Sequence, residues 1–271
     1  MRRIWLIADD YGLSPAVDDG ILELLAAGMI SGTGCMTVFS DWPDEARRLH
    51  DVAGTVAVGL HLTLTDQPSL TGRSTLAPDG TMPSLPRLLR GLLFGQIRTS
   101  DIARELDAQI GRFLEAMQRP PAFIDGHQHV HFLQPVRTWL RERAPDFAAK
   151  PWLRGAPAVG QSPLPGKTGF VRLLAAGFAG SATGSGYMVR GPLAGFYPWE
   201  RPDKFAPTMR ESLKRLPDGA VFMCHPGRTD AALRRRDKLI EARPVELDFL
   251  ASQDFEALLS ESGVALAGID P

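Results

Sequence analysis

The sequence predicts an α/β fold whose parallel strands form an irregular (β/α) barrel of the TIM-like kind. Short apolar runs alternate along the chain with segments of helical periodicity, which is typical of parallel strands joined by right-handed crossovers. About seven such units fit in this length, which favours a barrel over a doubly wound open sheet. The 271 residues, 44% of them hydrophobic, are sufficient for one domain with a substantial core.

Three strands and two helices are predicted in the N-terminal part of the chain. The apolar run Ile4–Ala8 is typical of a buried strand. A helix is expected after it, because Ser14 is a common N-cap residue, Pro15 fits the first helical position and Gly28 can end the helix. The other elements expected here are strands at Thr33–Val38 and Val56–Leu60 and a short helix at Pro43–His50.

The central part is predicted to hold one long amphipathic helix after an irregular segment. Residues 65–98 are rich in Pro, Gly, Leu and Arg and favour irregular structure with a short helix near Leu85–Leu93. Asp101–Met117 has apolar residues at helical spacing, with Ser100 or Asp101 as the expected cap. The elements expected next are a strand at Ala122–Asp125 and a helix at Pro135–Arg143.

A second irregular insertion is predicted near residues 151–205, where glycine and proline are frequent. Within it we expect Arg154 to end a further strand and Phe170–Phe178 to be helical. The elements expected after it are a helix at Asp203–Leu216, a strand at Ala220–Cys224, helical structure in Asp248–Ser262 and a strand at Val264–Ile269. Residues 1–271 are therefore predicted to form a single catalytic domain with insertions near 65–98 and 151–205.

Titratable side chains follow four of the predicted strands, at the point where each strand ends. Asp9 and Asp10 follow the first strand, His61 follows the third, and His127 and His225 follow two later strands. The carboxyl ends of parallel barrel strands lie on one face, where active sites are built. We therefore expect residues more than 200 positions apart in the sequence to converge.

Each of these residues also has an ordinary structural explanation. Asp9 and Asp10 could form a turn that caps the next helix, His61 could be a core histidine, and His225 could close a strand. The two aspartates can take different roles only if the chain kinks there, because neighbouring side chains of an extended backbone point to opposite sides.

The segment that contains His127, His129 and His131 is harder to explain by packing. At a spacing of two, three imidazoles would share one face of an extended segment. Two histidines and one carboxylate are the ligand set of many catalytic zinc sites, which leave a position open for water. Because imidazole suits zinc better than magnesium, we expect one divalent metal ion, with zinc favoured and magnesium as the alternative.

Four short motifs resemble those of the YdjC-like carbohydrate deacetylases, a family that includes chitooligosaccharide and hopanoid-biosynthesis deacetylases. The motifs are Ala8-Asp9-Asp10-Tyr11-Gly12-Leu13-Ser14, Gly59-Leu60-His61-Leu62-Thr63, Asp125-Gly126-His127-Gln128-His129-Val130-His131 and Cys224-His225-Pro226-Gly227. The resemblance covers about residues 3–268 and is weakest over the two insertions. It implies a polysaccharide-deacetylase-like barrel that removes the acetyl group from an N-acetylated sugar.

The resemblance also implies a role for each matched residue. Asp10, His61 and His127 would hold the metal ion. Asp9 would be the general base, and His225 would be the general acid. Apart from the resemblance, Tyr11, His129, His131 and Arg154 are expected to line the site or to contact substrate. Tyr11 could instead pack in the core or on the surface, and Arg154 could instead orient Asp9 or lie on the surface. Gln128 stands where some members have His, so that position is not a required ligand.

Composition limits the partners and the location that we expect. The net charge of −1 gives no electrostatic reason for a nucleic-acid partner. The apolar run at the start stops at Asp9, and no stretch reaches the roughly 18 apolar residues of a membrane span. We expect a cytoplasmic protein, with a homodimer as the base-rate assembly. Its expected ligand is a small N-acetylated sugar or a glycolipid head group.

Two other functions are compatible with the motifs. One is a metal-dependent hydrolase of another amide or ester bond, since Asp and His ligands at barrel strand ends also serve such enzymes; for phosphoesters, an evident phosphate-binding loop is missing. The other is a non-catalytic sugar-binding protein with a relict site. A catalytically inactive descendant would be expected to lose at least the base. The second function is therefore disfavoured by the intact set of Asp9, Asp10, His61, His127 and His225.

Overall fold

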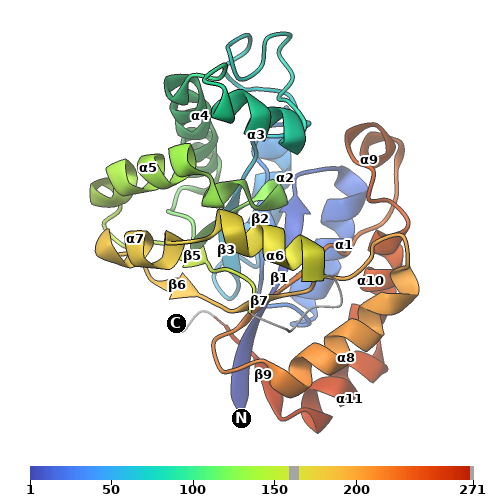
Figure 1. Cartoon of the computed structure of the whole chain (residues 1–271). Coiled ribbons are helices and arrows are strands. Elements are labelled where there is room, and N and C mark those ends of the chain that lie inside the picture. The colour runs from blue at the N-terminus through green and yellow to red at the C-terminus, as the bar shows by residue number, and fades with distance from the viewer. Residues whose placement is uncertain (159–164, 269–271) are drawn as a thin grey trace.

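The computed structural model describes residues 1–158 and 165–268 (Figure 1). Its strands are parallel and lie in the order β6-β5-β4-β3-β2-β1-β8-β7, with β9 paired to the start of β1. The strands are β1 (Arg2–Tyr11), β2 (Gly32–Cys35), β3 (Ala57–Leu62), β4 (Phe123–Gly126), β5 (Trp152–Arg154), β6 (Val189–Arg190), β7 (Leu193–Ala194), β8 (Val221–Cys224) and β9 (Val264–Leu266).

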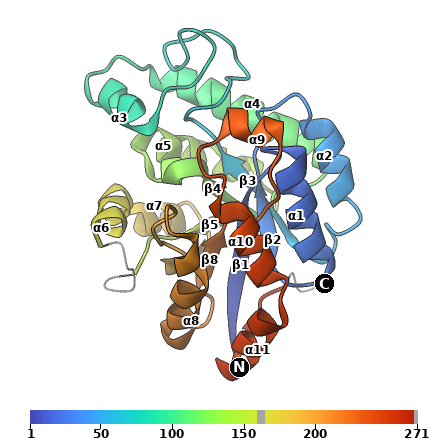
Figure 2. The same cartoon turned by 90° about the vertical axis from the view of Figure 1, so that its right-hand side faces the viewer.

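Helices surround the strands on both sides (Figures 1 and 2). The helices are α1 (Pro15–Ala26), α2 (Trp42–Leu49), α3 (Leu85–Leu93), α4 (Thr99–Met117), α5 (Gln134–Arg143), α6 (Pro165–Leu174), α7 (Phe178–Gly184), α8 (Phe205–Arg215), α9 (Ala231–Arg236), α10 (Ala242–Leu250) and α11 (Gln253–Glu261). Short 3₁₀ helices lie at η1 (His127–Phe132), η2 (Ala144–Asp146) and η3 (Pro202–Lys204).

The two end strands of the sheet are neighbours in the chain. Only Gly191 and Pro192 separate β6 from β7, and Pro157, just after β5, forms a parallel bridge with Leu193. The connection therefore brings the two edges of the sheet together, and the predicted irregular TIM-like barrel is confirmed. Figure 1 shows the N-terminus at the bottom and residues 65–84 at the top, beyond the carboxyl ends of the strands.

The central strand β1 is longer than the apolar run that predicts it. Its residues pair with β2 on one side and β8 on the other, where Ile7 lies opposite Gly32 and Met223 respectively. The following helix begins as predicted, since the Ser14 side chain accepts a hydrogen bond from the Val17 N–H at 3.4 Å and Pro15 is the first helical residue. This turn fixes the direction in which the chain leaves the strand end.

The predicted cap of the long helix α4 is wrong. The N-cap residue is Arg98, and the helix already includes Thr99 and Asp101. The Asp101 carboxylate instead accepts hydrogen bonds from the backbone N–H of Thr75 at 2.8 Å and from its hydroxyl at 2.5 Å. Buried Glu105, one turn later, accepts from the backbone N–H of residues 70 and 71. Two acids of α4 therefore order the irregular segment that precedes the helix.

The helix expected at Phe170–Phe178 is divided in the structure. Helix α6 ends at Leu174, and α7 begins at Phe178 after Gly177, whose φ of +73° is incompatible with a continuous helix. The final strand ends at Leu266, and residue 269 of the predicted strand lies outside the described residues. None of the helices in the described ranges combines the length and apolar character that crossing a membrane requires.

Candidate active site

The ends of β1, β3, β4 and β8 meet at one cavity of about 270 Å³. Asp9 and Asp10 reach it from β1, His61 from β3, and His127 and His225 from the turns that follow β4 and β8. The structure thus brings together all five residues that the sequence places at strand ends. The other lining residues are Leu85, Gly126, Gln128, His129, Lys167, Phe170, Val171, Trp199, Met223, Asp237 and Leu239.

A kink in β1 lets neighbouring aspartates face the same cavity. Asp10 has a φ of +72°, and the pairing of β1 with β2 is irregular between Ala8 and Tyr11. A positive φ is uncommon for a residue other than glycine, and here the Leu13 N–H donates a hydrogen bond to the Asp10 carbonyl at 3.0 Å and closes a turn. The separate roles expected for Asp9 and Asp10 require such a kink.

Asp10, His61 and His127 form a compact set of potential metal ligands. The Asp10 Oδ1 atom lies 3.1 Å from His127 Nδ1 and 3.4 Å from His61 Nε2. One donor atom from each residue lies within 4.8 Å of the other two. Burial alone would raise the pKa of Asp10, but Arg243 and His127 outweigh it and hold that pKa well below the usual range. Asp10 is therefore an ionised donor at neutral pH.

His61 is oriented by a residue to which the sequence motifs assign no role. Its Nδ1 donates a hydrogen bond to Asp125 Oδ1 at 2.7 Å, which leaves Nε2 directed toward Asp10. Burial disfavours the charged imidazole, yet the carboxylates of Asp125 and Asp9 raise the pKa of His61 to about 10. The surroundings therefore favour a positive charge at this position.

Arg154 binds the carboxylate that is expected to act as base. Its two terminal nitrogens lie 2.7 Å and 2.6 Å from the two oxygens of Asp9, and one of them also lies 2.5 Å from Asp125 Oδ2. Arg154 is 0% exposed. The surface position expected as an alternative for Arg154 is therefore wrong. The geometry fits orientation of Asp9, and contact with substrate does not fit, because the guanidinium is buried and does not line the cavity.

His225 faces Asp9 from the end of β8, the strand that pairs with β1. Its Nε2 lies 3.9 Å from Asp9 Oδ2, and its ring packs against Trp199 with centroids 5.2 Å apart. Within the described residues its Nδ1 has no hydrogen-bond partner. Burial lowers the pKa of His225 to about 4, although Asp10 and Asp9 act in the opposite direction. Its imidazole is therefore neutral at pH 7 in the unliganded protein.

A family model of YdjC-like proteins matches residues 3–261. The chain belongs to the YdjC-like family. Two bacterial relatives match along their whole length: the chitooligosaccharide deacetylases of Escherichia fergusonii and Serratia marcescens are 26% and 28% identical, over 98% of both chains in each case. A mouse carbohydrate deacetylase is 32% identical, but the match spans 49% of this chain and 44% of the mouse protein.

The fold also resembles a solved structure. A protein of Enterococcus faecalis, described as a proposed cellobiose-phosphate cleavage protein, superposes with a TM-score of 0.76 at 21% identity. The superposition covers 98% of this chain and 97% of the other. At this level of identity the similarity concerns the architecture, and it shows that this YdjC-like chain has the fold of a known protein along nearly its whole length.

The expectation that three histidines share one face of an extended segment is wrong. Residues 127–132 form a 3₁₀ turn in which Gln128 and His129 have φ values of 51° and 62°. His127 turns toward the metal-ligand set, and His129 lines the cavity wall. His131 is buried, with its Nε2 3.2 Å from the Arg154 carbonyl oxygen. Burial lowers the pKa of both His129 and His131, so neither is charged at neutral pH.

Tyr11 lies in the core of the YdjC-like protein and does not line the cavity. It is 0% exposed, and its hydroxyl donates a hydrogen bond to the Glu45 carbonyl at 2.8 Å. Burial raises its pKa above the usual value, so the hydroxyl keeps its proton. The substrate contact expected of Tyr11 therefore does not fit this position, which joins the strand end to helix α2 instead.

Three charged residues at the site were not identified from the sequence. Asp125 lies two positions before His127 in a motif that was recognised, so alternation along the strand could have placed it beside His61. Arg243 contacts Asp10, and Asp237 contacts Arg243. No local pattern predicts these two contacts. Asp10 and Arg243 are 233 positions apart in the sequence, and Asp237 lies outside the helices and strands.

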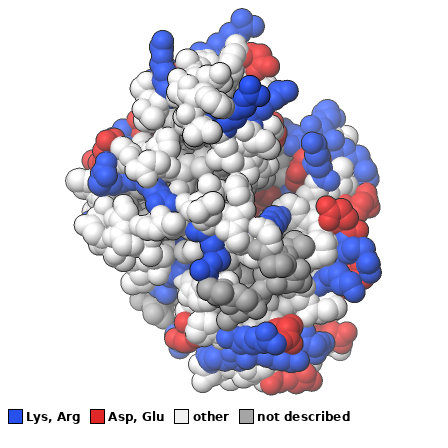
Figure 3. All heavy atoms as spheres, in the orientation of Figure 1, with Lys and Arg blue, Asp and Glu red and all other residues white. Residues whose placement is uncertain are grey.

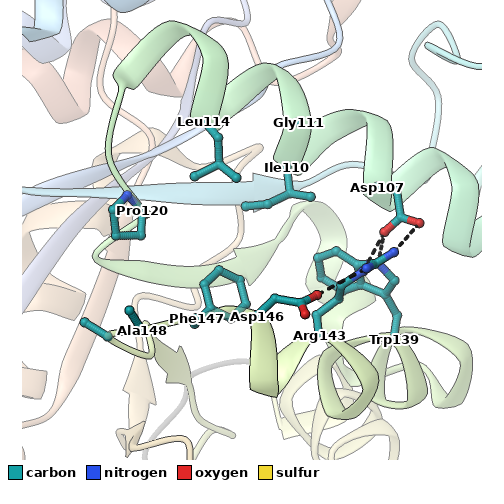
Figure 4. A pocket seen from close by; sticks show the side chains of 11 residues that line it. Asp107, Ile110, Gly111, Leu114, Pro120, Trp139, Arg143, Asp146, Phe147 and Ala148 are labelled. Atoms are coloured by element: carbon teal, nitrogen blue, oxygen red, sulfur yellow. Dashed lines mark hydrogen bonds and ion pairs between the residues drawn. The ribbon is translucent and has the colours of Figure 1, made fainter.

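A second, larger cavity lies away from this cluster (Figure 4). It has a volume of about 510 Å³ and is bounded by α4, α5 and the chain before β5. Its charged residues pair with one another, since Arg143 donates to Asp107 at 2.9 and 2.7 Å and to Asp146 at 3.2 Å. Among the residues that the structure describes, no histidine or cysteine lines it, so its size does not make it the better catalytic candidate.

Charged side chains of both signs lie on the face of the protein that contains α8. In the view of Figure 3, basic and acidic side chains are interspersed over α8 at the bottom of the molecule. Such mixing produces no extended field of one sign over that helix.

Proposed function

We propose that the protein is a metal-dependent hydrolase that removes the acetyl group from an N-acetylated sugar. The proposal depends on one observation: two histidines and an aspartate converge beside a second aspartate and a further histidine on the wall of one cavity. Membership of the YdjC-like family and the names of the two full-length bacterial relatives support the same reaction class.

The donor set and the charge balance fit one divalent cation. Four carboxylates cluster around two guanidinium groups, which leaves two negative charges when the imidazoles are neutral. Nitrogen donors favour zinc, and magnesium is the alternative. When bound, such an ion polarises the acetyl carbonyl and makes a water molecule easier to deprotonate. The carboxylates are Asp9, Asp10, Asp125 and Asp237, and the guanidinium groups are those of Arg154 and Arg243.

Asp9 is assigned the role of general base. Arg154 binds both of its oxygens, which fixes the plane of the carboxylate, and Asp9 still lines the cavity where a water molecule can reach it. A positioned base of this kind typically accelerates such a step by about 10²- to 10⁴-fold. Arg154 thus supports the reaction by holding Asp9.

His225 is assigned the role of general acid toward the leaving nitrogen. An amide nitrogen leaves poorly as an anion, so it needs a proton as the bond to the acetyl carbon breaks. Since the free imidazole is neutral at pH 7, it must gain that proton during the reaction. Asp9, 3.9 Å away, carries one after it has deprotonated the water. We infer that a single proton passes from water through Asp9 and His225 to the amine product.

The cavity wall supports an amphiphilic substrate. Its lining combines charged and imidazole groups with apolar surface from Leu85, Phe170, Val171 and Leu239. Lys167 lies 3.7 Å from the centroid of the Trp199 ring on the same wall. An N-acetylated sugar could place its acetamide beside the carboxylates and imidazoles while an apolar aglycone contacts the apolar side chains. Of the two expected ligand classes, this arrangement favours a glycolipid head group.

Acetate release from defined sugars tests the proposal. The protein is stripped with a chelator, supplied with Zn²⁺ or Mg²⁺, and assayed on N,N′-diacetylchitobiose and on an octyl glycoside of N-acetylglucosamine. We expect metal-dependent acetate release, with higher kcat/KM for the octyl glycoside, and none from an Asp9→Asn control. Absence of acetate from every N-acetylated sugar, with hydrolysis of another amide or ester, would reject the assignment.

A further inference from the structure

Helix α10 places two ionisable side chains in the core of the protein. Arg243 and Glu246 lie one turn apart on this helix, and both are 0% exposed. An ionised group is buried only at a considerable cost unless a partner offsets the loss of hydration. Here the partners of both side chains belong to the candidate active site, so the helix is connected to the catalytic apparatus at two points.

Arg243 occupies one oxygen of the aspartate that is expected to bind metal. Its Nη2 donates to Asp10 Oδ2 at 2.7 Å, whereas Asp10 Oδ1 faces the two imidazoles. The same nitrogen donates to Asp237 Oδ2 at 2.6 Å, and the Arg243 Nε donates to the Leu239 carbonyl at 2.9 Å. The guanidinium is therefore fixed from three directions, and Asp10 is left with a single oxygen for a metal ion.

A positive charge beside a metal ligand would by itself weaken cation binding. In this case Asp237 pairs with the same guanidinium nitrogen, which offsets the charge of Arg243. The remaining effect of Arg243 is to hold the Asp10 side chain in a single orientation. If this effect dominates, loss of the arginine weakens metal binding; if repulsion dominates, the loss strengthens it.

Glu246 holds the chain that carries the proposed general acid. Its Oε2 accepts a hydrogen bond from the backbone N–H of His225 at 2.6 Å, and its Oε1 accepts one from the Tyr197 hydroxyl. The Gly227 N–H donates to the Arg243 carbonyl at 3.2 Å, so the turn after β8 is tied to α10 twice. His225 Nδ1 has no hydrogen-bond partner among the described residues. The position of the ring therefore depends mainly on the hydrogen bond between the His225 backbone N–H and Glu246.

We propose that Arg243 and Glu246 are positioning residues through which α10 holds both halves of the active site. Arg243 fixes Asp10 so that one oxygen is presented to the metal ion, and Glu246 fixes the backbone of His225 so that its imidazole faces Asp9. The inference rests on the proposed function, because it assigns these contacts to a metal site and a general acid.

Metal affinity tests the role of Arg243 without any assay of turnover. Arg243→Gln is compared with wild type and with Arg215→Gln, a control at an exposed ion pair on α8. The dissociation constant for Zn²⁺ is measured by competition with a chelating indicator, and the ligand geometry is followed by the visible spectrum of bound Co²⁺. We expect affinity to fall roughly 10- to 100-fold with an altered Co²⁺ spectrum, and no change in the control.

Unchanged or tighter Zn²⁺ binding by Arg243→Gln would overturn the assignment of Arg243. If circular dichroism shows that this variant does not fold, Arg243→Gln is combined with Asp237→Asn, which removes the carboxylate left unpaired, and is compared with Asp237→Asn alone. A wild-type protein that binds neither Zn²⁺ nor Co²⁺ would overturn the proposed function together with this inference. Wild-type binding with an equally tight variant overturns the inference only.

Leaving-group dependence tests the role of Glu246. Glu246→Leu keeps much of the side-chain volume but removes both acceptor oxygens, so the His225 N–H and the Tyr197 hydroxyl each lose this partner. Misplacement of a catalytic group by about 1 Å can cost about 100-fold in rate. We expect a loss approaching this size on the N-acetylated sugar, a much smaller loss on 4-nitrophenyl acetate, whose leaving group needs no proton, and unchanged Zn²⁺ affinity. Equal losses on both substrates would overturn the assignment.

Discussion

The His61 Nδ1 atom donates a hydrogen bond to Asp125 Oδ1 at 2.7 Å, and both residues are buried. This bond fixes the tautomer of the imidazole, so Nε2 is the nitrogen that carries a lone pair toward Asp10 when the ring is neutral. Arg154 contacts Asp125 as well as Asp9. One buried carboxylate therefore connects the proposed metal ligands with the guanidinium that orients the proposed base.

We predict that Asp125→Asn weakens metal binding without unfolding the protein. The amide keeps the size of the carboxylate but withdraws the charge that orients His61 and increases its basicity, and such losses typically cost about 10- to 100-fold in affinity. Competition titration with Zn²⁺ measures the effect, with Asp107→Asn, which alters a remote ion pair, as the control. Equal affinities for the two variants would contradict this role of Asp125.

Metal binding is predicted to release a proton from His61. Its pKa is raised to about 10, so the imidazole is protonated at neutral pH in the metal-free protein and must lose that proton before Nε2 can bind a cation. We expect release of about one proton per Zn²⁺ and weaker binding as the pH falls. Calorimetry in buffers of different ionisation enthalpy measures the release, and a pH-independent affinity would contradict the prediction.

The raised pKa of His61 also makes the stability of the metal-free protein depend on pH. Because the folded-state pKa of His61 is raised above its value in the unfolded chain, about 6.5, the carboxylates around it stabilise the protonated fold. This contribution is fully present below about pH 6.5 and is lost as the pH rises toward 10. Urea unfolding of wild type and Asp125→Asn across this window should show a difference that shrinks at high pH.

Asp9→Asn is predicted to keep the metal and to lose most turnover. Asparagine retains the size of the side chain but cannot accept a proton from water, and removal of a general base typically costs about 10²- to 10⁴-fold in rate. Metal content by mass spectrometry and kcat on an N-acetylated sugar give the two readouts. A normal rate in this variant would reject Asp9 as the base.

His127→Ala is predicted to lose the metal, because it removes one of the three donors that lie within 4.8 Å of one another. His129→Ala is the matched control, since its side chain lines the same cavity but lies outside this donor set. Metal content after dialysis distinguishes the two variants. If His127→Ala retains the ion, one of the neighbouring histidines is the ligand instead.

Gly12→Ala is predicted to destabilise the fold around the kink. Gly12 has a φ of +88°, and an added Cβ atom would lie 2.5 Å from the Met36 carbonyl oxygen. Such strain costs on the order of 1–3 kcal/mol in the free energy of unfolding. Gly54→Ala, where a Cβ atom would have no neighbour within 4 Å, provides the control in a denaturant titration. Equal stabilities would show that the turn can adapt.

The sequence was most informative where local pattern and capping agree. The helix predicted at Leu85–Leu93 has those bounds in the structure, and Ser14 caps the helix that begins at Pro15. The cap of α4 was mispredicted because Asp101, a good capping residue by type, bonds instead to Thr75 in the preceding irregular segment. Local propensity does not contain that competing partner, which lies 26 positions away.

By itself, the sequence determined which residues stand at strand ends, since apolar runs that finish at Asp10, His61 and His225 can be read from local composition. Only the tertiary structure decided how the histidine segment turns, with Gln128 and His129 in the left-handed region. It also decided that Arg243 meets Asp10 across 233 positions. The physical reason is that hydrophobic periodicity fixes the face of each element, whereas the pairing of buried charges depends on which faces the barrel brings together.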